Sequence, residues 1–168
     1  MPLDRKPSRR NADDDLIDAV NRRLLLELQT DARLSLAELG RRVGLSAPAV
    51  GERLQRLQEA GVVRGYRAEL DPGALGFPLG VIIRVRPAAG ELHKVADLAR
   101  QTPEVVECHR ITGEDCFFMK LHVRDVQHME EVIDRFLLYG QTTTSIVQSS
   151  PVAARGLSLD TTGGHPSG

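Results

Sequence analysis

The sequence predicts an α+β protein with two domains: a winged helix-turn-helix, and a C-terminal ferredoxin-like βαββαβ domain with an antiparallel sheet. Helical spacing of apolar residues dominates up to residue 61, and strand-like segments alternate with helical segments after residue 80. A segment rich in proline and glycine, LDPGALGFPLG, separates the two regions. We therefore expect residues 13–69 to form the first domain, 70–79 a linker and 80–155 the second domain.

The ends and the composition of the chain limit its class. Residues 1–12 and 156–168 are polar, so a disordered N-terminal arm and a disordered tail are expected. With 41% hydrophobic and 27% charged residues, the chain has the composition of a soluble globular protein. No apolar run approaches the roughly 20 residues that cross a membrane, and no secretory signal is present. We expect a cytoplasmic protein whose two cysteines are free thiols.

The first two helices of the first domain are predicted from apolar spacing and capping residues. The first lies within residues 15–31. Its apolar stripe consists of Ile17, Val20, Leu24 and Leu28. The second helix begins after Ser35, where Glu38 three residues later completes a capping-box pattern. It is expected to end near Gly44.

The third helix is expected to begin after Ser46 and to stop at Gly61. Pro48 falls in its first turn, where a missing N–H has no cost. The buried stripe of this helix consists of Val50, Leu54 and Leu57. Residues 62–70 are expected to form a strand that completes the wing.

The second domain is expected to alternate strands and helices. The strands are expected within residues 80–87, 105–112, 116–123 and 142–152, and the helices within 91–102 and 125–140. The second of these helices is expected to bury Val126, Met129, Ile133, Phe136 and Leu137. Both helices should cover one face of the sheet and leave the other face open. Because the strand face with Val81, Ile83 and Val85 is too apolar to remain in water, we expect a partner subunit to cover it.

Charge is distributed unevenly along the chain. Residues 33–67 contain seven arginines and three glutamates, whereas residues 71–168 contain nine basic and twelve acidic residues. A basic segment joined to an acidic one is typical of a polyanion-binding module with a neutral or acidic partner domain.

Double-stranded DNA is the expected polyanion, because the third helix has one packed side and one free side. Arg53 is the candidate for a guanine contact, beside Arg56 on the free side. Small residues at the helix tip would allow close approach to bases; these are Ser46, Ala47 and Ala49. Arginines at the flanks are better placed for phosphates; these are Arg41, Arg42, Arg64 and Arg67. A solvated arginine-bearing helical bundle is the alternative interpretation.

The segment RITGEDCFFMKLHV contains carboxylates, a histidine and a cysteine, which invites comparison with a metal site or an active site. A tight turn at TGED would place Glu107 opposite Lys120 and His109 opposite Phe118. In this register Cys116 and His122 are about 20 Å apart along one strand, too far for one ion. Cys108 would point to the opposite face, so neither a metal site nor a disulfide is expected. Adjacent carboxylates diverge, so no catalytic site and no cofactor are expected.

The chain resembles the Lrp/AsnC (feast/famine) transcription regulators over residues 13–155. The resemblance rests on RRLLLELQTDARLSLAELGRRVGLSAPAVGERLQRLQEAGVVRGYRAELDPGALG, which is similar to their DNA-binding domain, and on TGEDCFF within the βαββαβ unit. It implies a homodimer built through the C-terminal sheets, further assembly to an octamer, and small effectors, commonly amino acids, bound where dimers meet.

The resemblance also implies that the hairpin turn lies at the effector pocket. In the family this turn commonly reads Gly, acidic, any residue, Asp. Gly113 and Glu114 match, Asp115 occupies the free position, and Cys116 replaces the usual aspartate. The segment YGQTTTSIVQSS contributes to the same pocket in the family, which implies roles for Thr142 and Thr144.

Together these features predict a sequence-specific DNA-binding regulator, not an enzyme, whose assembly or DNA affinity responds to a small effector such as an amino acid. A ligand-independent architectural DNA-binding protein of the same fold is the alternative, suggested by the substituted Cys116. A thiol redox sensor that uses Cys116 is a third hypothesis.

Overall fold

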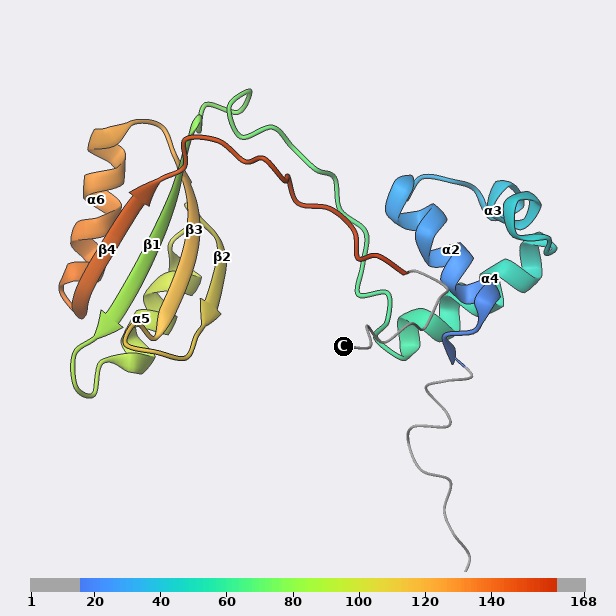
Figure 1. The fold of residues 1–168 in the computed structure, drawn as a ribbon, viewed down its shortest axis with the longest axis horizontal. Helices are drawn as coiled ribbons and strands as arrows, with labels where there is room; N and C mark the ends of the chain where they lie inside the picture. Colours follow the sequence, from blue (N-terminus) through green and yellow to red (C-terminus); the bar gives the residue numbers. More distant parts are fainter. Residues whose placement is uncertain (1–15, 160–168) are drawn as a thin grey trace, which may run out of the picture. The chain divides into compact units, whose positions relative to one another are not determined.

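The computed structural model describes residues 16–159. The described chain divides into two compact units (Figure 1). One contains the residues up to Ala68 together with residues 154–159, and the other is Glu69–Ala153. The arm expected at residues 1–12 and most of the tail expected at 156–168 lie outside the described residues. Part of that tail is described, and in it the Leu157 carbonyl accepts a hydrogen bond from Gln29.

The described part of the first unit contains three helices, and the predicted serine caps are confirmed. These helices are α2 (Ala19–Thr30), α3 (Leu36–Val43) and α4 (Ala47–Glu59). Ser35 Oγ accepts a hydrogen bond from the Glu38 amide at 3.1 Å, and Ser46 Oγ accepts one from the Ala49 amide at 3.4 Å. Each bond satisfies an amide that has no partner inside its helix. Gly44 ends α3 with a left-handed φ of 76°.

The predicted apolar stripes form the core of this unit. The residues of the α4 stripe are buried and pack with Leu24 of α2 and Leu39 of α3. Fully burying side chains of this size contributes roughly 1.5–3 kcal/mol each, so packing between the helices dominates the stability of so small a unit.

The wing strand expected at residues 62–70 is not present. The structure gives this segment no strand pairing, and every residue from 64 to 70 is exposed. A strand needs a neighbour to hydrogen-bond with, and the described part of this unit offers three helices and no such neighbour. The amides of Val62 and Val63 instead donate to the carbonyl of Leu57, which closes the end of α4.

The turn between α3 and α4 depends on a glycine that the sequence analysis did not single out. A Cβ added to Gly40 would lie 2.4 Å from the carbonyl oxygen of Leu45. The same turn is closed by a hydrogen bond from the Leu45 amide to the Gly40 carbonyl at 2.9 Å. The close approach of α3 to the turn therefore requires the absence of a side chain at this position.

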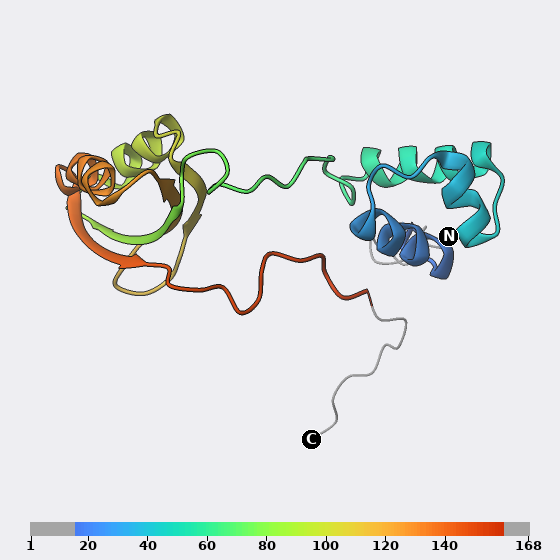
Figure 2. The ribbon, with the colours of Figure 1, turned by 90° about the horizontal axis from the view of Figure 1, so that it is seen from above.

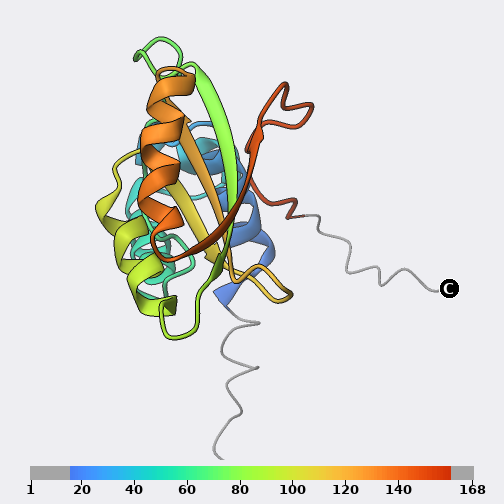
Figure 3. The same ribbon diagram turned by 90° about the vertical axis from the view of Figure 1, so that its left-hand side faces the viewer.

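The second unit has the expected βαββαβ order. Its elements are β1 (Leu79–Pro87), α5 (Leu92–Gln101), β2 (Val105–Arg110), β3 (Phe117–Val123), α6 (Val126–Leu137) and β4 (Gly140–Ile146). The sheet order is β2-β3-β1-β4 with every pair antiparallel. Both helices lie on one face of the curved sheet, and no element of this unit covers the other face (Figure 2, Figure 3). The ferredoxin-like arrangement is confirmed.

The strand face expected to meet a partner subunit is instead the core of this unit. Val81, Ile83 and Val85 have no exposed surface and pack in one cluster with residues of both helices. The sequence pattern identified an apolar face correctly but assigned it to the wrong side, because alternation alone does not say which face the helices cover. The uncovered face carries the alternate residues of β1, including Arg84 and Arg86.

The buried face of α6 also differs in part from the prediction. Val126 and Leu137, which were expected to point inward, are 52% and 50% exposed. Val132 is fully buried and His128 is 5% exposed. The buried stripe of α6 is therefore rotated toward Val132. The imidazole of His128 lies within this stripe and is hydrogen-bonded to the Arg124 amide and to Glu104. In the described part of the chain, no helix has the length and apolarity needed to cross a membrane.

Substitution of Gly40 by alanine should destabilise the first unit, because the added methyl group collides with backbone that cannot rotate away. We expect a loss of about 2 kcal/mol in the free energy of unfolding, measured by urea denaturation. Gly51→Ala is the matched control. Its Cβ would approach no closer than 3.4 Å to a flexible Leu36 side chain, so it should be neutral or stabilising by up to about 1 kcal/mol. Equal effects of the two substitutions would contradict the packing described for the turn.

Candidate functional sites

Helix α4 has a free outer face opposite its buried stripe. The exposed residues of this face are Pro48, Glu52, Gln55, Arg56 and Glu59. Ser46 is exposed at the N-terminal tip, while Ala47 and Ala49 are half-buried beside it. A helix that is packed on one side and free along the other has the shape that enters a DNA major groove.

Arg53, the expected guanine contact, is engaged within the unit. Its Nη1 donates to Asp18 Oδ2 at 2.6 Å and to Asn21 Oδ1 at 3.0 Å, and its side chain is 25% exposed. Asp18 also caps α2 by accepting from the Asn21 amide. Burial raises the pKa of Asp18, but the hydrogen bond from Asn21 and the Arg53 guanidinium outweigh it and lower the pKa below 3.8. Arg53 therefore ties α4 to the start of α2.

The remaining candidate arginines fall into two groups. Arg41 and Arg42 both pair with Glu38, and Arg42 also donates to Glu27 at 2.6 Å. Arg56, Arg64 and Arg67 are exposed, and no carboxylate of the described chain lies within 4.0 Å of any of their guanidiniums. Among the candidate arginines, the charge of these three is not engaged by a carboxylate of the described chain.

Gln55 lies next to Arg56 on the outer face, and the sequence analysis did not select it. Its amide donates to Glu59 at 2.8 Å, an exposed contact that can exchange. The signal was present in the sequence, because residue 55 lies seven positions after Pro48 and therefore on the same side of the helix.

The hairpin between β2 and β3 has the register predicted from its charges. Glu107 pairs with Lys120, and His109 pairs with Phe118. The turn itself contains Gly113 with a φ of 113°, a backbone conformation that favours glycine. Its two carboxylates reach across to β1, which the sequence analysis did not anticipate.

Arg84 and Arg86 of β1 neutralise the acidic pair of the hairpin. The Glu114 carboxylate pairs with Arg86. Asp115 lies 3.4 Å from Arg84 Nη1 and 4.0 Å from Arg86 Nε, and its side chain is 21% exposed. Two carboxylates and two guanidiniums thus gather at one end of the uncovered sheet face. Such a group can hold an ammonium and a carboxylate at the same time.

Cys116 does not occupy the charged position of this group. Its amide donates to the Val85 carbonyl at 3.0 Å, and its side chain packs against the core of the second unit. The carboxylate that the arginines contact belongs to the preceding residue, Asp115.

Thr142 and Thr144 lie on the other face of the sheet from this charged group. They pair with Val85 and Ile83, whose side chains point to the helices. Residues directly opposite each other in an antiparallel pair share a face, so the two threonines are separated from Arg84 by the sheet. Gln141 and Thr143, the partners of Arg86 and Arg84, share the charged face and are the polar residues that sequence reasoning missed.

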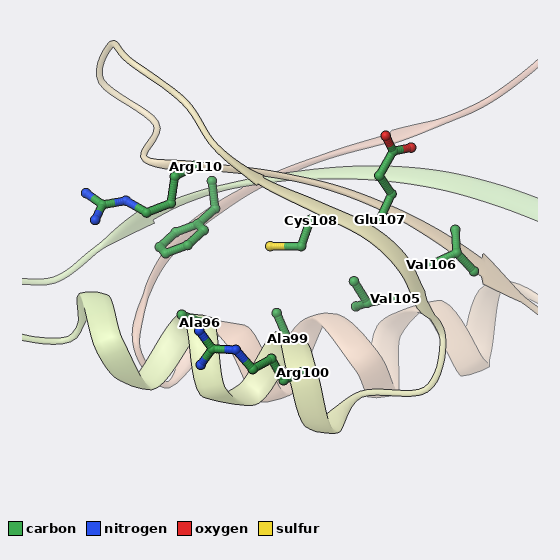
Figure 4. A pocket seen from close by; sticks show the side chains of 9 residues that line it. Ala96, Ala99, Arg100, Val105, Val106, Glu107, Cys108 and Arg110 are labelled. Atoms are coloured by element: carbon green, nitrogen blue, oxygen red, sulfur yellow. The ribbon is translucent and has the colours of Figure 1, made fainter. Parts of the chain in front are cut away.

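Cys108 points to the helical side of the sheet, as the predicted alternation requires. It lines a hollow of about 370 Å³ between β2 and α5 (Figure 4). Burial raises the pKa of the Cys108 thiol, against a smaller lowering by Arg100, so the thiolate is disfavoured. Both cysteines are free. Among residues 16–159, no three histidine, cysteine or acidic side chains are arranged to hold a metal ion.

Comparison with known proteins matches both units. The family model for the AsnC-type helix-turn-helix domain matches residues 17–58, and the model for the Lrp/AsnC ligand binding domain matches residues 80–157. The HTH-type transcriptional regulator LrpC of Bacillus subtilis is 30% identical over 79% of this chain and 92% of its own length. The proline dehydrogenase transcriptional activator of Rhodobacter capsulatus is 36% identical over 71% of this chain and 79% of its own length.

Solved structures agree with these matches. A transcriptional regulator from Neisseria meningitidis, determined as a complex with L-Met, has a TM-score of 0.81 at 29% identity, covering 86% of this chain and 97% of its own. The structure of B. subtilis LrpC has a TM-score of 0.79 and covers 82% of this chain and 99% of its own.

The role assigned to Arg53 predicts an energetic coupling to Asp18. In a double-mutant cycle of Arg53→Gln and Asp18→Asn, we expect about 1 kcal/mol of coupling in the free energy of unfolding, allowing for partial exposure of the pair. Because the folded-state pKa of Asp18 is lowered, this contribution is present above pH 3.8 and is lost as the pH falls through the folded-state value. If the effects of the two single substitutions on the free energy of unfolding simply add at pH 7, Arg53 is not held by Asp18.

Proposed function

The chain belongs to the Lrp/AsnC family of transcriptional regulators, and we propose that it binds a specific DNA site through α4 and responds to an amino acid at the hairpin. The observation that carries the proposal is the match of an AsnC-type helix-turn-helix domain to a unit whose α4 has a free, arginine-bearing outer face. DNA binding by a prokaryotic regulator of this kind takes place in the cytoplasm.

Arg56 and Gln55 are the proposed base-reading residues. Both are exposed on the outer face of α4, and arginine and glutamine form paired hydrogen bonds with guanine and adenine edges. Ser46, Ala47 and Ala49 at the helix tip allow the backbone to approach the groove.

Arg64, Arg41 and Arg42 are the proposed phosphate contacts, which set affinity and position on the duplex. Arg53 is reassigned. Its ion pair with Asp18 supports a positioning role, in which it holds α4 at a fixed angle to α2.

The proposed effector is an amino acid, bound at the end of the uncovered sheet face. An α-amino acid carries an ammonium and a carboxylate a short distance apart, and the hairpin group offers complementary charges to both. Asp115 and Glu114 can accept from the ammonium, and Arg84 and Arg86 can donate to the carboxylate. The L-Met complex of the N. meningitidis regulator supports this ligand class. Asp115 thus compensates for Cys116 from the neighbouring position.

A second copy of the chain is proposed to complete this site. The Glu114 side chain is 84% exposed, so a single chain cannot enclose a small ligand there. The uncovered sheet face is suited to self-association, because half-buried Ile82 and Phe118 lie among groups of opposite charge such as Glu107 and Lys120. We therefore propose a homodimer through these sheet faces, with further assembly up to an octamer that the effector shifts by its differential affinity for the assembly states.

Arg56→Ala should lower discrimination between a selected DNA site and random DNA by roughly 5- to 100-fold, because a base contact is lost. Arg64→Ala should weaken both kinds of binding equally and reduce the salt-dependence slope by about one. The measurement is fluorescence anisotropy at several salt concentrations, with an operator selected from random-sequence DNA. Arg100→Ala, on the second unit, is the control and should change neither value. If both variants lose the same affinity for the selected site as for random DNA, the roles assigned to Arg56 and Arg64 are contradicted.

Arg84→Gln and Asp115→Asn should each weaken amino-acid binding by about tenfold or more, since each removes one charged partner of the ligand. Isothermal titration calorimetry with L-Met first and then the other amino acids measures this, with assembly size followed by sedimentation. Thr142→Val, on the helical side of the same sheet, is the control. A loss of binding in Thr142→Val with none in Arg84→Gln would place the effector on the wrong face for this proposal.

A further inference from the structure

The second unit has another hollow at the far end of β3 from the hairpin. It measures about 370 Å³, within the range of small-molecule sites. Its walls are Leu70, Pro72, Leu75 and Phe77 from the segment before β1, with Pro103, Glu104, Val106, His122 and Arg124 from the sheet side. The seven residues of β3 separate it from the hairpin by about 23 Å, so the two sites cannot share one ligand.

An ordered turn forms one wall of this hollow. The carbonyl of Pro72 accepts hydrogen bonds from the amides of Leu75 and Phe77, at 3.1 and 2.8 Å. Asp71 Oδ1 accepts from the amide of Gly73 at 2.8 Å. This part of the segment expected to be a linker thus contains an ordered turn, and it groups with the second unit.

A β-bulge forms part of the opposite wall. The pairing of β2 with β3 shifts between Val105 and Glu107, so Val106 drops out of the ladder. Bulges re-aim side chains in this way, and Val106 lines the hollow with 58% of its surface exposed. Leu70 and Leu75 are 65% and 58% exposed in the same place. Apolar surface gathered around a cavity favours an apolar ligand.

The charge left unbalanced at the hollow is positive. The charge of Glu104 is offset by neighbours outside the hollow: its Oε1 lies 2.9 Å from His128 Nε2, and its Oε2, which accepts no hydrogen bond, lies 3.5 Å from the Arg135 guanidinium. The guanidinium of Arg124 has no carboxylate within 4.0 Å among the described residues, although its backbone amide donates to His128 Nδ1. Burial, with a smaller effect of the Lys120 charge, lowers the pKa of His122, which keeps its imidazole neutral at pH 7.

We propose that this hollow binds a small monocarboxylate with an apolar body, whose carboxylate meets Arg124 and whose body lies against Leu75, Phe77 and Val106. The site is additional to the hairpin site and independent of it. A ligand here contacts both the loop that connects the two units and the sheet of the second unit.

The test is calorimetric titration of the full chain with phenylacetate and 4-methylpentanoate, each compared with its neutral amide. The acids should bind at least tenfold more tightly than the amides, because only the acids pair with Arg124. Arg124→Gln should bring acid and amide to similar affinity, and Leu75→Ser should weaken both. Arg100→Gln, on α5 and outside both the hairpin and this hollow, is the control and should leave all these affinities unchanged, whether or not the hairpin binds an amino acid.

Three results would overturn the proposal: no binding of either acid, equal binding of acid and amide to the native chain, or an undiminished acid preference in Arg124→Gln. Sedimentation tests the alternative interpretation, in which the exposed apolar surface around the hollow joins copies of the chain. If Leu75→Ser reduces assembly size and leaves acid binding intact, the apolar surface joins copies of the chain and the ligand site is refuted. Arg124 is exposed, so Arg124→Gln should fold even if Leu75→Ser does not. The ratio of acid affinity to amide affinity in Arg124→Gln then decides whether Arg124 holds the carboxylate.

Discussion

The register of β1 between β3 and β4 is the constraint on which the second unit depends. Alternate residues of this central strand point in opposite directions, so Val81, Ile83 and Val85 enter the core while Arg84 and Arg86 face outward. A shift by one residue would bury two guanidiniums beneath the helices, which the loss of their hydration forbids. The same register fixes which strand residues can reach the hairpin carboxylates, and so it defines the proposed effector site.

Features set by neighbouring residues could be predicted from the sequence. The serine caps at Ser35 and Ser46, the buried stripe of α4 and the hairpin register at Glu107 follow from spacing and local hydrogen bonding, and all are observed. The order of elements and the family then follow, because a helix-turn-helix and a βαββαβ unit each show a recognisable order of helical and strand-like spacings of apolar residues. The stop of α3 at Gly44 belongs to the same class of local signals.

Features set by contacts between distant segments could not be predicted. Arg53 was expected on the free side of α4, but it turns toward α2, and its pairing with Asp18, 35 positions earlier, depends on how two helices meet. Arg84 likewise meets Asp115 only after the sheet has formed. Alternation identified the face of Thr142 relative to its neighbours but not the side on which the helices lie. The missing wing strand has the same cause, because strand propensity does not supply a partner.

We propose that the outward face of β1, through Arg84 and Arg86, holds the effector beside Glu114 and Asp115. A crystal structure of the protein grown with L-Met, or with whichever amino acid binds most tightly, tests it most directly. We expect the ligand carboxylate within hydrogen-bond distance of one or both guanidiniums and the ligand ammonium beside a hairpin carboxylate. A ligand found on the helical side of the sheet, against Thr142, with both arginines still paired as in the free chain, would contradict the account.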